Sequence, residues 1–309
     1  MGRWCLYASQ ETFKMKNIFL IVNPKSGTKD YNHNLNIVIN EFKKNKVEYT
    51  LSKTEYSGHA IDLVRSFDIV KYDSVCAIGG DGTLYEVLNG MLTRGDNIKI
   101  PIGLLPGGTG NSFLKTVGHL NLIDSVNNIL RNMPMNVDLM EVNASGKKYY
   151  SLNLVGWGMA TDISVFAEKL RFIGGQRYNI ASIFEIIKNK KRIASLIVDG
   201  EERKDDFCFI ISCNTKYIGK GMKIAPKALI DDGLLDLIIV KKTTRATLLS
   251  VFPKIFNGTH IDHDACEYVH CNSFSIIPEE NGQLNIDGEI IGATPVDVNI
   301  VKGGINLLV

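Results

Sequence analysis

Short apolar runs alternate with helical patterns between residues 17 and 133, and this alternation limits the fold more than any other feature. The apolar runs predict strands at 17–22, 47–52, 74–78 and 100–105. The stretches between them predict helices near 33–45, 58–67, 83–92 and 121–132. Because strands that alternate with helices form parallel β-α-β units, residues 15–134 are predicted to be an open parallel α/β domain.

The pattern changes after Met133-Pro134, where strands become more frequent than helices. Strands are predicted at 136–142, 148–155, 193–199, 206–213, 234–240, 271–277, 283–287 and 296–301, and helices at 162–173 and 178–190. This pattern is typical of an antiparallel β-sandwich, so an α/β protein of two domains is predicted, with the second domain at 135–295. Residues 296–309 are expected to be a C-terminal segment that can return to the first domain, and residues 1–14 a disordered tail.

Composition limits the partners that the protein can have. The 309 residues carry a net charge of only +2, so no global basic field points to nucleic acid as a partner. The six cysteines include no CxxC pair, which is typical of a reduced, cytoplasmic protein. No run approaches the roughly eighteen apolar residues of a transmembrane helix, so any membrane association is expected to be peripheral.

A glycine turn follows the third predicted strand, at Gly79-Gly80-Asp81-Gly82-Thr83. Glycines let backbone N–H groups approach a ligand closely, and a helix N-terminus attracts negative charge, so this turn predicts a phosphate site. A carboxylate beside a phosphate is repulsive unless a cation lies between them. Asp81 is therefore predicted to hold Mg²⁺, directly or through water.

Two other turns are predicted to join this one. They are Asn23-Pro24-Lys25-Ser26-Gly27 after the first strand and Pro106-Gly107-Gly108-Thr109-Gly110-Asn111 after the fourth. Since ligands bind outside the carboxyl ends of parallel strands, all three turns should form one nucleotide site. Thr54 is expected either to face the adenine or to cap a helix.

Acidic residues late in the chain supply candidates for proton transfer and for cation binding. Asp287 and Glu289 would share one face of an extended segment, as a general base and its partner, although Asp-Gly is also a common hairpin turn. Asp232, in the segment 229–234, belongs either to a turn or to a loop that binds a cation through carboxylate and main-chain oxygens.

Five motifs occur in a particular order along residues 17–309. They are Asn23-Pro24-Lys25-Ser26-Gly27, Gly79-Gly80-Asp81-Gly82-Thr83, Pro106-Gly107-Gly108-Thr109-Gly110-Asn111, Asp231-Asp232-Gly233-Leu234-Leu235-Asp236 and Ile286-Asp287-Gly288-Glu289. In this order they resemble the diacylglycerol kinase catalytic-domain family, which includes bacterial diacylglycerol kinases, related lipid kinases and sphingosine kinases. The second motif alone is shared with NAD kinases and related sugar kinases.

The resemblance implies roles for the residues at these positions. The residues implied to contact ATP are given with their neighbours in the three turns. They are Asn23, Lys25, Thr54, Gly79, Gly80, Asp81, Gly82, Thr83, Glu86, Gly108, Thr109 and Asn111. The implied magnesium loop uses Asp232 and the carbonyls of Leu229 and Leu234. Glu289 would accept the proton with Asp287 beside it, and Asp81 is the rival base. Ser112 departs from the Asp that is common in bacterial diacylglycerol kinases and is similar to the small residue of sphingosine kinases.

The resemblance implies an ATP- and Mg²⁺-dependent kinase that phosphorylates a lipid hydroxyl, on diacylglycerol or a related lipid. The alternatives are a sphingoid-base kinase, an NAD-kinase-like enzyme acting on a soluble hydroxyl, and a non-catalytic nucleotide or lipid binding module. The expected partners are the lipid and, transiently, a membrane surface, with a homodimer through sheet edges left open. In the family, the second domain offers a lipid pocket between the domains. The helical face of Ile163, Phe166, Leu170 and Ile173, flanked by Lys169, Arg171 and Arg177, is expected either to provide an apolar cleft with a basic rim for a lipid taken from a membrane or to be an ordinary core-facing helix, which its amphipathic pattern favours.

Overall fold

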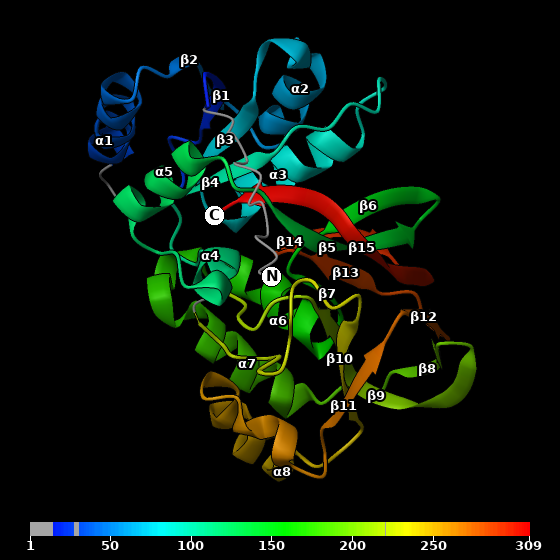
Figure 1. Cartoon of the computed structure of the whole chain (residues 1–309). Coiled ribbons are helices and arrows are strands. Elements are labelled where there is room, and N and C mark those ends of the chain that lie inside the picture. The colour runs from blue at the N-terminus through cyan, green and yellow to red at the C-terminus, as the bar shows by residue number, and fades with distance from the viewer. Residues whose placement is uncertain (1–14, 28–30, 220) are drawn as a thin grey trace, which may run out of the picture.

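The first domain has helices on both faces of a parallel sheet. The computed structural model describes residues 15–27, 31–219 and 221–309, so the predicted tail at 1–14 lies outside the described residues (Figure 1). The strands are β1 (Asn17–Val22), β2 (Glu48–Lys53), β3 (Ser74–Gly79) and β4 (Ile102–Pro106), in the order β2-β1-β3-β4. The helices are α1 (Tyr31–Lys44), α2 (His59–Ser66), η1 (Ile69–Lys71), α3 (Asp81–Leu92), α4 (Ser112–Val117) and α5 (Leu122–Arg131). The short helix α4 was not predicted.

Alternate side chains of β1 enter different hydrophobic cores, as expected for a parallel strand covered on both faces. Leu20 packs with Phe42 of α1 and Ile129 of α5, whereas Ile21 packs with Leu88 of α3. Both faces are therefore buried, and the site has to form at the ends of the strands.

The second domain is an antiparallel β-sandwich with helices on one side. Its strands are β5 (Met135–Ala144), β6 (Lys147–Ser151), β7 (Leu154–Gly158), β8 (Ile193–Val198), β9 (Glu201–Cys213), β10 (Leu235–Lys241), β11 (Glu267–Cys271), β12 (Ser273–Pro278), β13 (Gln283–Ile286), β14 (Glu289–Ala293) and β15 (Val296–Leu308). Its helices are α6 (Met159–Lys169), η2 (Arg171–Gln176), α7 (Arg177–Lys188), α8 (Arg245–Val251), η3 (Phe252–Phe256) and η4 (Thr259–Asp262). The helix α8 lies at the end of the molecule away from the first domain (Figure 1).

Two predicted strands are each divided in the structure. The segment 148–155 forms β6 and β7 because Asp287 accepts hydrogen bonds from the backbone N–H groups of residues between and beside them. The segment 271–277 is divided between β11 and β12 at Asn272, where Asp199 accepts backbone hydrogen bonds from Asn272 and Ser273. The strand β14 and the helix α8 were not predicted.

One long strand, β15, joins the two domains. It pairs antiparallel with β5 and β12 in the sandwich, and its end pairs parallel with β4, where Leu307 lies opposite Ile102. None of the helices in the described ranges has the length and apolar composition that crossing a bilayer requires. The described cysteines are free and buried.

Candidate active site

The three glycine-rich turns meet at the carboxyl ends of β1, β3 and β4. Gly107 donates a backbone hydrogen bond of 2.9 Å to the carbonyl of Gly79. A β-carbon on Gly108 would overlap the Cα of Gly80, and one on Gly27 would overlap the carbonyl of Gly107. The turns can approach one another so closely only because these positions lack side chains.

The N-terminus of α3 faces the cleft between the domains. Its N-cap, Gly80, has an extended backbone and supplies no side-chain cap. Asn23 donates a 3.0 Å hydrogen bond from Nδ2 to Thr83 Oγ1, which ties the first turn to this helix end. Uncapped N–H groups at a helix N-terminus are suited to bind phosphate oxygens.

Asp81 has a structural partner that the sequence did not indicate. Its carboxylate accepts hydrogen bonds from the backbone N–H of Ser112, at 2.7 Å, and from Ser112 Oγ, at 3.1 Å. Burial raises the pKa of Asp81, and the bonds from Ser112 oppose this shift. Asp81 therefore fixes the start of α4 as well as facing the cleft.

Glu86 and Asn111 also support the local backbone. Glu86 accepts hydrogen bonds from the N–H groups of Gly58, at 2.8 Å, and Ala60, at 3.1 Å, and so holds the start of α2. Asn111 accepts a hydrogen bond from Gly108 N and donates one to Gly108 O, which shapes the third turn. These two residues position the loops in addition to any contact they make with a nucleotide.

The loops border a cleft of about 800 Å³ between the domains. Most predicted nucleotide contacts line it: Asn23, Lys25, Thr54, Gly80, Asp81, Gly82, Thr83, Glu86, Gly108 and Thr109. Gly79 and Asn111 instead border a small cavity behind the turns. The second domain contributes Asn153, Ser164, Tyr178, Ile218, Asn285, Asp287 and Glu289, among others, to the opposite wall.

Asp287 is part of a hairpin turn, so the prediction that it shares one face of an extended segment with Glu289 is wrong. Its φ is +52°, and Ile286 pairs with Glu289 across the turn. Asn and Asp tolerate this backbone conformation better than most residues do, and Asp-Gly is a preferred two-residue hairpin turn.

The Asp287 carboxylate is buried and surrounded by donors. It accepts hydrogen bonds from Ser151 Oγ (2.7 Å) and from the N–H groups of Leu152 (2.8 Å), Asn153 (2.8 Å) and Leu154 (2.9 Å). Burial raises the pKa of Asp287, and these hydrogen bonds oppose the shift. This geometry suits a residue that holds the hairpin in place.

Glu289, the first residue of β14, is exposed and faces the cleft. Its Oε1 lies 3.3 Å from the position that a β-carbon on Gly82 would occupy. The hairpin therefore brings a carboxylate from the second domain directly to the N-terminus of α3 in the first. Both late acidic residues line the cleft, but Asp287 is buried whereas Glu289 is exposed.

The segment 229–234 does not line this cleft. Asp232 accepts a hydrogen bond from Leu234 N, at 2.9 Å, and Leu229 is exposed. Within the described ranges, the structure contains no group of three or more His, Cys, Asp or Glu residues arranged to hold a metal ion.

Sequence reasoning overlooked Asp138, which is buried and accepts hydrogen bonds from Gly233 N, at 2.6 Å, and Gly303 N, at 2.7 Å. An aspartate between Val137 and Leu139 in an apolar strand was the available signal.

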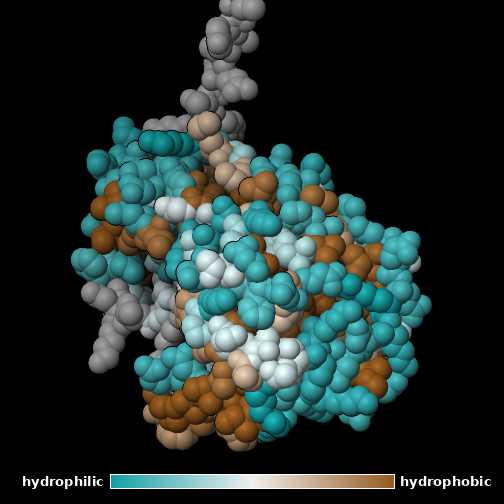
Figure 2. Space-filling view, turned by 90° about the horizontal axis from the view of Figure 1, so that it is seen from below, coloured by the Kyte–Doolittle hydropathy of each residue, from teal (hydrophilic) through white to brown (hydrophobic). Residues whose placement is uncertain are grey.

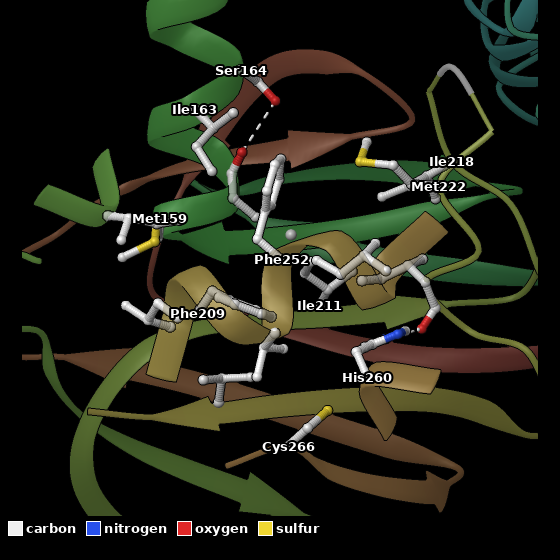
Figure 3. Close-up of a pocket in the computed structure, with 18 of the residues that line it drawn as sticks. Met159, Ile163, Ser164, Phe209, Ile211, Ile218, Met222, Phe252, His260 and Cys266 are labelled. Atoms are coloured by element: carbon white, nitrogen blue, oxygen red, sulfur yellow. Dashed lines mark hydrogen bonds between the residues drawn. The ribbon is translucent and has the colours of Figure 1, made fainter. Parts of the chain in front are cut away.

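A second, apolar cavity of about 130 Å³ adjoins the cleft. Side chains from α6, β9 and η3 surround it, including Ile163, Ile211 and Phe252 (Figure 3). The residues that line both the cavity and the cleft are Leu154, Ser164, Tyr178, Ile218, Met222, Phe252 and Asn285. At this boundary Asn285 Nδ2 donates a 2.9 Å hydrogen bond to Ser164 Oγ.

An apolar lipid pocket was expected from the resemblance, but most of the lining of this cavity was not predicted, because it comes from residues 154 to 285 and no local pattern marks it. Ile163, one of the residues expected either to form an apolar cleft for the lipid or to face the core, lines the cavity. Phe166 stacks on Phe184 with ring centroids 4.6 Å apart. Phe166 and Leu170 are half-buried and Ile173 is 37% exposed, so the predicted apolar face is only partly internal.

Comparison with known proteins identifies the family. The family described as "Diacylglycerol kinase catalytic domain" matches residues 17–142, and that described as "YegS C-terminal NAD kinase beta sandwich-like domain" matches residues 153–309. A diacylglycerol kinase of Staphylococcus saprophyticus is 30% identical, over 91% of each chain. The chain belongs to the diacylglycerol kinase family.

Other members of this lipid kinase family are similar over most of the chain. Sphingosine kinase 1 of Arabidopsis thaliana is 26% identical, over 89% of this chain and 68% of its own. The crystal structure of a diacylglycerol kinase from Bacillus anthracis str. Sterne superimposes with a TM-score of 0.79 at 26% identity, covering 96% of this chain and 97% of that one. The two-domain arrangement is thus that of the diacylglycerol kinase family.

Proposed function

We propose that this protein transfers the γ-phosphoryl group of ATP to a hydroxyl group of a lipid in a Mg²⁺-dependent reaction. One observation carries the proposal: the apolar cavity shares lining residues with the polar cleft, which the glycine turns and Glu289 border. A hydrocarbon chain in the cavity would leave its polar end beside a bound nucleotide. Neither a soluble acceptor nor a nucleotide alone requires such a cavity.

The first domain binds the nucleotide in this proposal. Backbone N–H groups at Gly80 and Gly82 approach the phosphates, where the α3 N-terminus favours negative charge. The terminal amine of Lys25, which lies 3.4 Å from the carbonyl of Glu55 at the cleft wall, adds positive charge. Phosphoryl transfer depends mainly on such positioning and charge neutralisation.

Asp81 is the carboxylate in the cleft that would hold Mg²⁺, which prefers oxygen ligands and keeps several waters. Such an ion would neutralise charge on the transferred phosphoryl group. The bonds from Ser112 leave the Asp81 carboxylate with capacity to accept further contacts, since each oxygen has two lone pairs. The loop around Asp232, outside the cleft, remains a proposed structural site for the same ion.

Glu289 accepts the proton in this mechanism. As the lipid hydroxyl oxygen bonds to the γ-phosphorus, the bond from that phosphorus to the bridging oxygen of ADP breaks and the hydroxyl proton passes to Glu289. Asp287 fixes the hairpin that carries Glu289 and is a positioning residue. Asp81 is the alternative base.

A sphingoid base is the second candidate acceptor, after diacylglycerol and related lipids. Ser112 favours it, because sphingosine kinases have a small residue at this position where bacterial diacylglycerol kinases commonly have an aspartate. Both acceptors present a hydroxyl beside a long hydrocarbon chain, so both suit the cavity.

The test is a radiolabelled ATP assay against detergent-dispersed diacylglycerol, monoacylglycerol, sphingosine, ceramide and phosphatidylglycerol, with NAD as a soluble control. Label in an organic-phase product is expected. Phosphorylation of NAD alone would instead indicate an NAD-kinase-like enzyme. Protection by ATP against thermal unfolding without turnover on any acceptor would indicate a binding module.

A further inference from the structure

The second domain carries an exposed apolar surface on the outer sides of its helices, here called the apolar cap. Its side chains, between 37% and 84% exposed, are Phe172, Ile173, Ile180, Ile183, Phe184, Ile187, Leu249 and Phe256. Figure 2 looks at the molecule from the α8 end, and a contiguous hydrophobic area occupies one edge of this otherwise mostly hydrophilic face. These residues lie on η2, α7, α8 and η3, which pack against one another in that order.

The helix α7 is apolar on two faces. Ala181 and Ile186 are buried, while Ile183 is 47% exposed and Ile187 is 57% exposed on the outer side. A surface helix of a globular protein normally presents polar residues to water. Apolar residues on the outer face therefore indicate that another phase or molecule covers it.

Positive charge is concentrated beside the cap. Residues 169–192 contain seven Lys or Arg and one Glu, a formal charge of +6. Glu168, Glu280 and Asp162, outside this segment, pair with Arg177, Lys190 and Arg192, which leaves an excess of +3 (6 − 3) in a chain whose net charge is +2. Lys190 and Lys191 are exposed just beyond α7, and the amine of Lys188 lies 4.5 Å from the ring centre of Phe184. Apolar residues bordered by lysines and arginines are typical of surfaces that bind anionic membranes.

The cap lies directly outside the apolar cavity. The inner sides of α7 and η3 contribute Tyr178, Ile186 and Phe252 to the cavity wall. On its outer side α7 exposes Ile183, and the exposed Phe256 of η3 also lines the cleft. A hydrocarbon chain that leaves a bilayer at the cap would reach the cavity without crossing much water.

We propose that the apolar cap docks onto the surface of an anionic phospholipid bilayer, with Ile183 and Ile187 entering the boundary between headgroups and acyl chains. The proposal deepens the proposed function, because it rests on a lipid acceptor that has to be collected from a membrane. The charge of residues 169–192 favours a bilayer over a second copy of this chain, since two such segments would repel each other.

Sedimentation of the full chain with vesicles tests this docking independently of turnover. The vesicles are phosphatidylcholine alone or with roughly a third phosphatidylglycerol, the lipid that supplies the negative surface. The apolar variant is Ile183→Gln/Ile187→Gln. Its matched control, Val70→Gln/Ile98→Gln, changes two exposed apolar residues of the first domain. A charge variant, Lys190→Glu/Lys191→Glu, is compared with Lys43→Glu/Lys44→Glu on α1.

Wild-type protein is expected to sediment with the anionic vesicles. The apolar variant should bind them roughly tenfold more weakly, because less apolar surface is buried. The charge variant should lose roughly tenfold or more on anionic vesicles and little on neutral ones. Both control variants should bind like the wild type.

Three results would overturn the docking proposal. The first is failure of the wild type to bind either kind of vesicle. The second is a loss of vesicle binding in the control variants equal to that in the test variants. The third is a concentration-dependent dimer that Ile183→Gln/Ile187→Gln dissociates without changing vesicle binding. A protein that binds vesicles but phosphorylates no lipid would retain the docking surface and refute the proposed function. Normal turnover on detergent-dispersed lipid without vesicle binding would support the proposed function and refute the docking surface.

Discussion

The Asp287 carboxylate accepts a 2.7 Å hydrogen bond from Ser151 Oγ, across 136 positions of sequence. The same carboxylate also accepts hydrogen bonds from three backbone N–H groups. Together these bonds fix the turn after β13 to the corner between β6 and β7. A residue so placed affects the site through the backbone that it holds.

Asp287→Asn should therefore destabilise the fold. An amide presents an N–H₂ group to some of these donors, so the free energy of unfolding in urea is expected to fall by about 2–4 kcal/mol. Asp264→Asn, at an exposed position, should change it by less than about 0.5 kcal/mol. Equal effects would mean that the buried hydrogen bonds contribute nothing.

Glu289→Gln should remove activity and leave the fold intact. The side chain is exposed, so the midpoint of thermal unfolding is expected to stay within a few degrees of the wild type. Loss of a general base lowers turnover by roughly 10²- to 10⁴-fold. Glu280→Gln, at another exposed position of the same domain, is the control. Normal turnover in Glu289→Gln would point to Asp81 as the base.

Gly108→Ala should impair nucleotide binding. Its methyl group would overlap the Cα of Gly80, so the turns after β3 and β4 would have to move apart. The KM for ATP is expected to rise at least roughly tenfold, because misplaced donors no longer match the phosphates. Gly95→Ala, where a methyl group meets no atom within 4 Å, should bind ATP normally. An unchanged KM in Gly108→Ala would show that close packing of the turns is unimportant for ATP.

Ile163→Trp should discriminate between acceptors by chain length. The larger side chain fills part of the apolar cavity, so turnover on long-chain lipids is expected to fall while turnover on short-chain analogues persists. Ile123→Trp, exposed on α5, should affect neither. Parallel losses on both chain lengths would contradict a role for the cavity in holding the hydrocarbon.

His260 should make stability depend on pH. It is buried, and its Nε2 donates a 2.9 Å hydrogen bond to the carbonyl of Ile224. Burial lowers the pKa of His260, so the unfolded chain binds a proton below about pH 6.5 while the folded protein does not. The stabilisation is present above that pH and is lost as pH falls further.

The comparison is urea unfolding of wild type and His260→Gln between pH 8 and the mildly acid range, since Gln keeps an N–H donor for Ile224. The wild type should lose up to roughly 1.4 kcal/mol per pH unit more than the variant does. Identical slopes would show that His260 takes up its proton equally in both states.

Local patterns predicted the first domain well because each part of it is local. The strand before Gly79, the glycine turn and the helix after it all follow from consecutive residues, and the rim at which turns gather follows from parallel topology. The positions of Asn23 and Thr83 at one rim could be inferred in this way. The bond from Ser112 to Asp81 could not, because it depends on α4, which is too short to give a clear period.

The second domain was harder to predict because long-range contacts decide it. The corner at Leu152 and Asn153 depends on Asp287, more than 130 positions later. The same contact places Asp287 in a turn and brings Glu289 to the cleft. The apolar cavity and the apolar cap depend on which side of α7 faces inward, and a helix with apolar residues on both sides does not reveal that by periodicity.

The pairing of β15 with β4 has a consequence for how the protein is made. On a ribosome, the first domain emerges with the β4 edge of its sheet unpaired, because the residues that cover it lie at the end of β15. Exposed sheet edges invite pairing with other chains. The nascent protein is thus most prone to aggregate after its nucleotide-binding half is complete and before the final strand arrives, and the first domain expressed alone would keep that open edge permanently.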